Sequence, residues 1–344
     1  MLSNLYQVIR KVGNDSRKRV GRIEPFVSTE LAFASFTVSA MARNMINFSE
    51  LNSEQLREFK DRYDAYIFDM DGCLVHLEGP PIQGVKEALA EISKNGKSIH
   101  VVTDNCLSTL KDISTRVNGL FPAIKKENVM SCGHLAVRYL KEVNFNKKVY
   151  VIGLEKGIVT ELKDHGFHVL HDEEIVKLAI GDLRKIKFED NVGAVVVAGD
   201  MNFNYMKMFK AANYLADPEV LLIQSHQPNI ALFNPVTPAV GAIASAVKAG
   251  SGRNDSIGMG KGGEYCSKYL KSLGFPVERC LFVGDGLPND IQAGNMSGMD
   301  TMLTLTGACN LKDVESAKAK NRVNHIPTYY INSVADLIKA FKTE

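Results

Sequence analysis

The stretch Ala65-Tyr66-Ile67-Phe68-Asp69-Met70-Asp71-Gly72 indicates both the fold and the site, because an apolar run of strand length leads directly into two acids and a glycine. Acids spaced i, i+2 at the end of a strand lie on the same side of it. Gly72 permits a sharp turn of the backbone, so both carboxylates can face one small volume beyond the sheet edge. Two negative charges there need a cation, a proton or a phosphate-bound metal. The segment is therefore a candidate for Mg2+-assisted chemistry with an aspartate nucleophile.

The composition is that of an ordinary globular protein. The chain has 344 residues, 45% of them hydrophobic and 23% charged, and two domains are expected at this length. A net charge of +2 and a pI near 8.1 give no large field of one sign, so we expect no nucleic-acid partner. No apolar stretch approaches the roughly 20 residues of a bilayer span, so we expect no membrane partner either.

The N-terminal region differs from the rest of the chain. Up to Ala40 it is rich in arginine and lysine and poor in acids. Such a start is compatible with a mitochondrial transit peptide, although we prefer to interpret residues 1–50 as an N-terminal extension that is loosely packed or disordered. The six cysteines are scattered without zinc-like spacing, which indicates reduced thiols. We therefore expect a cytoplasmic location, with the mitochondrion as the alternative.

Apolar runs of strand length alternate with helical patterns along the remaining chain, which is typical of parallel α/β units. The predicted strands are 65–68, 98–102, 148–152, 194–198, 220–223, 280–284 and 301–305. The predicted helices are 85–95, 107–117, 156–163, 205–216, 263–273, one that begins near 289, and 333–341. This order predicts an α/β fold with a Rossmann-like parallel sheet.

The residues after the predicted strands carry the chemistry, because ligands of open parallel sheets bind beyond the carboxyl ends of the strands. Taken singly, an Asp after a strand, a Thr-Asp-Asn helix cap and one lysine have ordinary structural explanations. Four motifs of charged and polar residues in one order are much harder to explain as turns. They are Asp69 with Asp71, Thr103-Asp104-Asn105, Gly260-Lys261-Gly262, and the run from Gly284 to Asp290 that includes Asp285.

These four motifs, in this order, resemble those of the haloacid dehalogenase superfamily. Within it the chain resembles the p-nitrophenyl phosphatase-like branch, which includes phosphoglycolate and pyridoxal phosphate phosphatases. The resemblance runs from about residue 51 to the C-terminus. It extends beyond the catalytic motifs to Ser131–Leu140, to Tyr150-Val151-Ile152-Gly153, to Gly193–Leu215 and to Ser251-Gly252-Arg253.

The resemblance implies a phosphoric monoester hydrolase that acts through an aspartyl-phosphate intermediate with Mg2+ as cofactor. Asp69 is the implied nucleophile, and Asp71 is the implied acid and base for the leaving alkoxide and the attacking water. Mg2+ is expected on the Asp69 carboxylate, the Asp71 carbonyl and Asp285, with Asp290 as a further ligand or as an acid behind the ligands.

The same resemblance implies the groups that bind the substrate. Thr103 and the backbone beside Asp104 and Asn105 are expected to hydrogen-bond the phosphoryl oxygens. Lys261 is expected to neutralise both the nucleophile and the transferring group. The implied partner is a small phosphorylated metabolite such as phosphoglycolate, pyridoxal phosphate or an aryl phosphate.

The long insertion between Thr103 and Lys261 has enough predicted strands and helices for a separate domain. The resemblance implies that it is an α/β cap that selects the substrate and in many relatives mediates homodimerisation. We predict a catalytic core of residues 51–130 and 236–344, with the inserted cap at residues 131–235.

Several positions depart from the pattern of the branch. Ser225-His226-Gln227-Pro228 replaces a usual Thr-Asn-x-Asp, and Asp104 replaces an Asn next to the phosphate pocket. No group that performs the chemistry is lost, but the physiological substrate and the catalytic efficiency stay open. The alternative interpretation is a catalytically weak or inactive homologue that serves as a metabolite-binding or interaction module.

Overall fold

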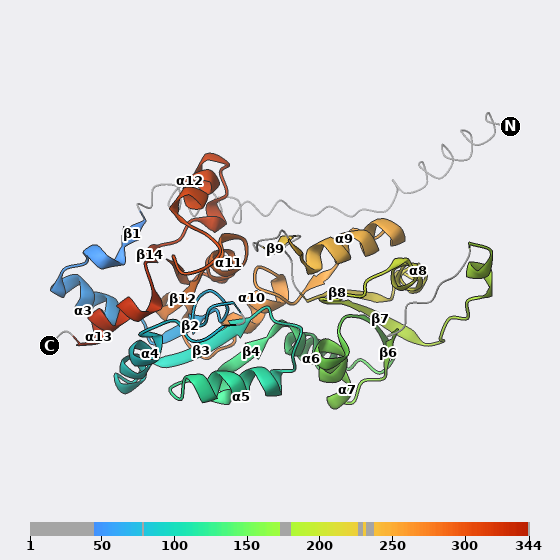
Figure 1. Cartoon of the computed structure of the whole chain (residues 1–344), viewed down its shortest axis with the longest axis horizontal. Coiled ribbons are helices and arrows are strands. Elements are labelled where there is room, and N and C mark those ends of the chain that lie inside the picture. The colour runs from blue at the N-terminus through green and yellow to red at the C-terminus, as the bar shows by residue number, and fades with distance from the viewer. Residues whose placement is uncertain (1–44, 78, 173–179, 226–229, 232–236, 343–344) are drawn as a thin grey trace, which may run out of the picture. The chain divides into compact units, whose positions relative to one another are not determined.

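The computed structural model describes residues 45–77, 79–172, 180–225, 230–231 and 237–342 (Figure 1). Residues 1–44 of the predicted N-terminal extension lie outside these ranges, as does His226. In the described part of the chain, the two larger sheets contain seven and five strands, and every strand pair in them is parallel. Helices accompany both sheets, so the predicted α/β fold class is confirmed.

The larger sheet lies mostly in the predicted core. Strands β12, β2 and β3 are neighbours in it, with Val283 opposite Phe68 and Phe68 opposite Val101. Their carboxyl ends therefore meet at one edge of the sheet. The strand order is β1 (Ile46–Asn47), β14 (Tyr329–Ile331), β13 (Asp300–Thr304), β12 (Cys280–Gly284), β2 (Ala65–Phe68), β3 (Ser98–Thr103) and β4 (Val129–Ser131).

Alternate residues of β2 contribute to two different hydrophobic clusters. Tyr66 and Phe68 pack in a cluster that includes side chains of α3, α4 and α13, whereas Ala65 and Ile67 join one that includes side chains of α10 and α11. This alternation is what a strand buried on both faces requires. The helices of the core are α3 (Ser53–Arg62), α4 (Val85–Lys94), α5 (Leu110–Leu120), α10 (Glu264–Lys271), α11 (Gln292–Ser297), α12 (Leu311–Ala319) and α13 (Ile338–Lys342).

The helix predicted at 107–117 begins later than expected. The side chain of Thr109 accepts a hydrogen bond from the backbone N–H of Asp112, which makes Thr109 the N-cap and Leu110 the first helical residue. The side chain of Asn105 accepts from the backbone N–H of Leu107, so residues 105–109 form the loop that follows β3 instead of a helical turn. Local capping chemistry thus lengthens the loop beside the predicted phosphate site.

The five-stranded sheet has four strands within the predicted cap region, residues 131–235, and its fifth strand, β11 (Ile257–Gly258), lies beyond that range. The strand order is β11, β8 (Leu221–Gln224), β7 (Val192–Val197), β5 (Lys148–Ile152) and β6 (Val169–His171). Its helices are α6 (Cys132–Glu142), α7 (Thr160–Asp164), α8 (Tyr205–Tyr214) and α9 (Val240–Ser251). The core sheet includes residue 46, and the cap sheet includes residue 258. Since membership of a sheet does not by itself set a domain limit, the limits at 51, 131 and 235 stay a prediction.

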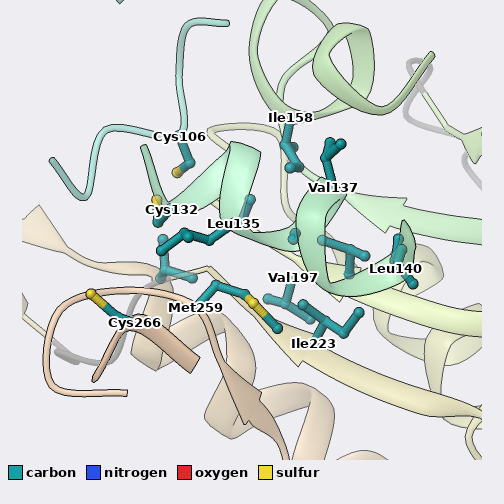
Figure 2. Packing of buried hydrophobic residues seen from close by; sticks show 14 of the residues in the cluster. Cys106, Cys132, Leu135, Val137, Leu140, Ile158, Val197, Ile223, Met259 and Cys266 are labelled. Atoms are coloured by element: carbon teal, nitrogen blue, oxygen red, sulfur yellow. The ribbon is translucent and has the colours of Figure 1, made fainter. Parts of the chain in front are cut away.

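One hydrophobic cluster extends through both sheets. It contains Ile67 and Phe282 of the core together with Val197 and Ile223 of the cap. Figure 2 shows α6, which carries Leu135, lying among the labelled members of this cluster. Burial of a shared apolar surface favours association of the two sheets. No helix in the described ranges is long and apolar enough to cross a membrane.

Candidate active site

Three of the four predicted motifs lie at one edge of the core sheet. Asp69 follows β2, Thr103 ends β3, and Asp285 follows β12. These strands are adjacent and parallel, which brings the motifs together although the sequence separates them widely. The strand ends thus act as the rigid support of the site.

Asp69, Asp285 and Asp290 form a cluster of buried carboxylates. One oxygen from each lies within 4.8 Å of the other two, and the residues are 4%, 7% and 0% exposed. Backbone amides fix two of the acids. Oδ2 of Asp290 accepts from the N–H groups of Asp285 at 3.1 Å and Gly286 at 2.9 Å, and Oδ2 of Asp285 accepts from the N–H of Ala308 at 2.6 Å. The carboxylates are therefore preorganised around one small volume.

Lys261 supplies the positive charge of this cluster. Its side chain is 2% exposed, and its ammonium group forms ion pairs with Asp69 and, at 2.7 Å, with Asp290. Its backbone N–H donates to Oδ1 of Asp104 at 2.8 Å. The acid that departs from the family pattern thus accepts a hydrogen bond from the segment that carries the lysine.

The loop after β3 is organised by hydrogen bonds between side chains and backbone. Oγ1 of Thr103 accepts from the N–H of Asn105 at 3.1 Å, and Oδ1 of Asn105 accepts from the N–H of Leu107 at 2.9 Å. Thr103 is 2% exposed, whereas Asn105 is partly exposed. These bonds are those of a tight turn, and they give the loop a defined shape beside the carboxylate cluster.

Asp71 lies in the turn that leaves β2. It is partly buried and forms a bridge with Val75. The next residue, Gly72, has φ of +87°, and a Cβ there would overlap the carboxylate of Asp285. Glycine is therefore needed at 72 for both conformation and space. The turn contacts Asp285 at Gly72, so the neighbouring Asp71 lies close to the acid cluster.

Burial determines the electrostatics of the cluster. It raises the pKa of Asp69, with the neighbouring acids adding to the effect, and it raises the pKa of Asp285 to about 7. Burial alone would lower the pKa of Lys261, but the carboxylates of Asp290 and Asp69 outweigh it and hold that pKa well above its usual value. When all three acids are ionised, their carboxylates outnumber the one ammonium and leave an excess of negative charge. Such a site favours a further cation.

The donor set of this cluster fits Mg2+. All three side chains offer carboxylate oxygens, which are the ligands that this hard cation prefers. A Mg2+ ion could therefore be held by Asp69, Asp285 and Asp290.

A glycine that was not singled out from the sequence also shapes the site. Gly307 lies beyond β13, and a Cβ at this position would overlap the Asp285 carboxylate. The neighbouring Ala308 donates its N–H to that same carboxylate. The rule that found the other motifs, inspection of the residue after each strand, would also have pointed to this segment because β13 is next to β12.

The cap contains a cavity of about 330 Å3. Its wall includes the buried ion pair between Lys207 and Asp200, whose Nζ and Oδ2 atoms are 2.6 Å apart. The lining residues are Gly153, Leu154, Glu155, Lys156, His171, Asp200, Asn202 and Lys207. A Cβ on Gly157, just after this wall, would overlap the carbonyl oxygen of Cys106 in the loop after β3. The cavity wall and the predicted phosphate loop are therefore close neighbours.

Two family models match the chain. A haloacid dehalogenase-like hydrolase model matches residues 66–168, and a second model of the same type of hydrolase matches residues 259–337. Among curated relatives, the 4-nitrophenylphosphatase of Schizosaccharomyces pombe is 30% identical over 83% of this chain and 96% of its own length. Phosphoglycolate phosphatase 2 of Arabidopsis thaliana is 30% identical over 85% and 98%, and human chronophin is 29% identical over 87% and 100%.

Solved structures share the fold. The 4-nitrophenylphosphatase of Thermotoga maritima matches 82% of this chain and 99% of its own, with 21% identity and a TM-score of 0.68. The p-nitrophenyl phosphatase of Archaeoglobus fulgidus matches 81% and 99%, with 22% identity and a TM-score of 0.68. The chain belongs to the haloacid dehalogenase-like hydrolase family. It is an enzyme of the phosphoric monoester hydrolase class, and the resemblance drawn from its motifs is confirmed.

Proposed function

We propose that the chain is a Mg2+-dependent phosphatase that hydrolyses a small phosphomonoester through an aspartyl-phosphate intermediate. One observation carries the proposal: the buried Asp69 carboxylate is paired with Lys261 inside a cluster with Asp285 and Asp290. A nucleophilic carboxylate that meets an anionic phosphate needs this compensation, because the two negative charges repel each other.

Asp69 acts as the nucleophile in the first step. An oxygen of its carboxylate attacks phosphorus, the bond between phosphorus and the ester oxygen breaks, and Asp71 gives its proton to the leaving alkoxide. In the second step, Asp71 takes a proton from water while the water oxygen attacks phosphorus. The bond from phosphorus to Asp69 then breaks and releases inorganic phosphate.

The remaining residues bind and neutralise the phosphoryl group. Thr103 and the backbone amides at Asp104 and Asn105 hydrogen-bond its oxygens, and the Lys261 ammonium offsets the charge that develops on them. Mg2+ would be held by the carboxylates of Asp69 and Asp285, the carbonyl of Asp71, and Asp290, and when bound it neutralises the phosphoryl oxygens.

We propose that the cap selects the substrate. The names of two relatives specify phosphoglycolate and 4-nitrophenyl phosphate as substrates. The polar lining of the cap cavity, with Lys156 and Asn202, supports a polar leaving group here. We further propose a cytoplasmic enzyme that forms a homodimer through the cap, where Met201 and Tyr205 are 83% and 61% exposed. Sedimentation of the purified chain and fractionation of cells test these two points.

Phosphate release tests the proposal directly. The native chain is expected to release phosphate from p-nitrophenyl phosphate with Mg2+, and Asp69→Asn is expected to lose at least about a thousandfold in rate, since it removes the nucleophile. A panel of small phosphate esters then identifies the preferred substrate. A native chain no more active than Asp69→Asn on the whole panel would instead support the binding-module alternative.

A further inference from the structure

Three side chains converge near the core–cap junction, outside the carboxylate cluster. They are His134 in α6, Glu161 in α7 and His165 at the C-terminal end of α7. One donor atom from each lies within 4.8 Å of the other two. The mechanism proposed above uses none of these residues.

Glu161 is the centre of this group. It is 3% exposed, and its Oε1 lies 2.7 Å from Nδ1 of His134 and 3.6 Å from Nδ1 of His165. Its Oε2 accepts a 2.7 Å hydrogen bond from the backbone N–H of Leu110, the first residue of α5. Burial alone would raise the pKa of Glu161, but the bonds from His134 and Leu110 outweigh it and lower that pKa. The Glu161 carboxylate is therefore held in place by its hydrogen bonds to α5 and α6.

The imidazoles are positioned to share a ligand with this carboxylate. The side chains of His134 and His165 are 19% and 29% exposed, so an ion can approach from solvent while Glu161 stays shielded. Ligands about 2.0–2.1 Å from a tetrahedral ion are about 3.3 Å apart. The separations of 2.7 and 3.6 Å from Glu161 Oε1 to the two imidazole nitrogens bracket that value.

The chemistry of the donors distinguishes this group from the acid cluster. Two imidazole nitrogens and one carboxylate oxygen suit Zn2+, whereas Mg2+ prefers oxygen ligands alone. We propose that His134, Glu161 and His165 form a binding site for a divalent ion of the zinc type, with water in the fourth position. On binding through Nδ1, each ring carries its proton on Nε2. His134 then gives up its 2.7 Å hydrogen bond to Oε1 of Glu161, and His165 gives up its 2.7 Å hydrogen bond to the Glu161 carbonyl oxygen.

The position of the site gives it a structural consequence. Glu161 connects α7 to the N-terminus of α5, which follows the predicted phosphate loop. The hydrogen bond between His134 and Glu161 also connects α6 to α7. A bound ion thus fastens two helices of the inserted domain to the helix after Thr103-Asp104-Asn105.

Zinc binding in the presence of excess Mg2+ tests the proposal. The full chain, with Mg2+ saturating the oxygen cluster, is titrated with Zn2+ against a chromogenic chelator. We expect one tightly bound Zn2+ per chain, and an affinity at least about tenfold lower in His134→Gln and in His165→Gln. His168→Gln is the matched control, because His168 is exposed and lies only three residues beyond His165. It is expected to bind Zn2+ like the native chain.

Co2+ gives a second measurement that needs no variant. In the native chain, Co2+ at this site is expected to show the visible absorption of four-coordinate Co2+, which Zn2+ abolishes and excess Mg2+ does not. The proposal is wrong if no Zn2+ is retained in excess Mg2+, if both histidine variants retain it fully, or if His168→Gln loses it equally. It is also wrong if the histidine variants change only the pH dependence of unfolding. Each of these results leaves the proposed phosphatase activity untouched.

Discussion

The backbone N–H of Lys261 donates a 2.8 Å hydrogen bond to Oδ1 of Asp104, and this bond joins two segments 157 residues apart in the sequence. The ammonium of the same lysine reaches the nucleophile candidate Asp69. An acid at position 104 therefore does more than add negative charge beside the phosphate pocket. It holds the backbone of Lys261 in place. In the described part of the chain, the ammonium of Lys261 is the only one paired with the carboxylate cluster.

Replacement of Asp104 tests this positioning role. Asp104→Ala removes the acceptor of the Lys261 N–H and is expected to lower kcat/KM for p-nitrophenyl phosphate by about 10- to 100-fold, since a hydrogen bond to a charged group contributes about 1.5–3 kcal/mol. Asp104→Asn keeps an acceptor oxygen and is the matched control. It should stay within about threefold of the native chain. Equal losses in both variants would show that the charge of Asp104, and not its bond to Lys261, is what matters.

Gly307 tests the placement of Asp285. In Gly307→Ala the new methyl group overlaps the Asp285 carboxylate, so we expect the Mg2+ concentration for half-maximal activity to rise at least about tenfold. Gly119→Ala is the control, because a Cβ at Gly119 in α5 meets no atom within 4 Å. Activity is measured over a Mg2+ series for both. An unchanged Mg2+ requirement in Gly307→Ala would contradict the assignment of Asp285 as a ligand.

The pH dependence of Mg2+ binding follows from the raised pKa of Asp285. Burial, together with Asp290, raises that pKa to about 7 in the metal-free protein. Below this pH Mg2+ must displace a proton, so its affinity is expected to fall by up to about tenfold per pH unit, and above it the affinity levels off. The linked effect on stability has the opposite sign. Protonation favours the folded state, so the metal-free protein loses stability as the pH rises toward 7. Calorimetric titrations of Mg2+ on either side of pH 7 measure the first effect, and a pH-independent affinity would contradict it.

The buried pair in the cap is expected to be costly to break. The side chains of Lys207 and Asp200 are 3% and 1% exposed and 2.6 Å apart. Asp200→Asn or Lys207→Met alone leaves an uncompensated buried charge, which is expected to lower the free energy of unfolding by about 3–5 kcal/mol. The double variant should cost less than the sum of the two.

A more exposed pair in the same domain provides the control for this comparison. Lys210 and Asp172 are 25% and 29% exposed, so Lys210→Met should cost less than about 1 kcal/mol. Equilibrium unfolding in denaturant gives all four values. If Lys207→Met lowers the free energy of unfolding no more than Lys210→Met does, burial does not make the Lys207–Asp200 pair costly to break.

The sequence was most informative where a strand is buried on both faces. The apolar run at Ala65–Phe68 and its two following acids predicted both the central strand and the place of Asp69. The parallel α/β fold followed from the alternation of such runs. The strands β1 and β11 were not predicted, because they have only two residues each and their pairing partners are far away in the chain.

The contacts of the site were harder to predict than its members. Spacing in the sequence gives no sign that Asp104 accepts from Lys261, or that Gly307 touches Asp285, because both contacts depend on how the strands lie side by side. The start of α5 at Leu110 was also missed, since the Thr109 cap competed with the apolar pattern that begins at Leu107. The sequence also gives no sign of the group of His134, Glu161 and His165, because the packing of two helices brings these residues together.

Trapping of the phosphorylated residue tests the central claim most directly. The native chain is mixed with a phosphate ester and Mg2+, quenched within one turnover, and treated with borohydride, which reduces an acyl phosphate to an alcohol. Peptide mass spectrometry is expected to find the reduced residue at position 69, and none in Asp69→Asn. Reduction at another acid, or turnover without any reduced residue, would contradict the assignment of Asp69 as the nucleophile.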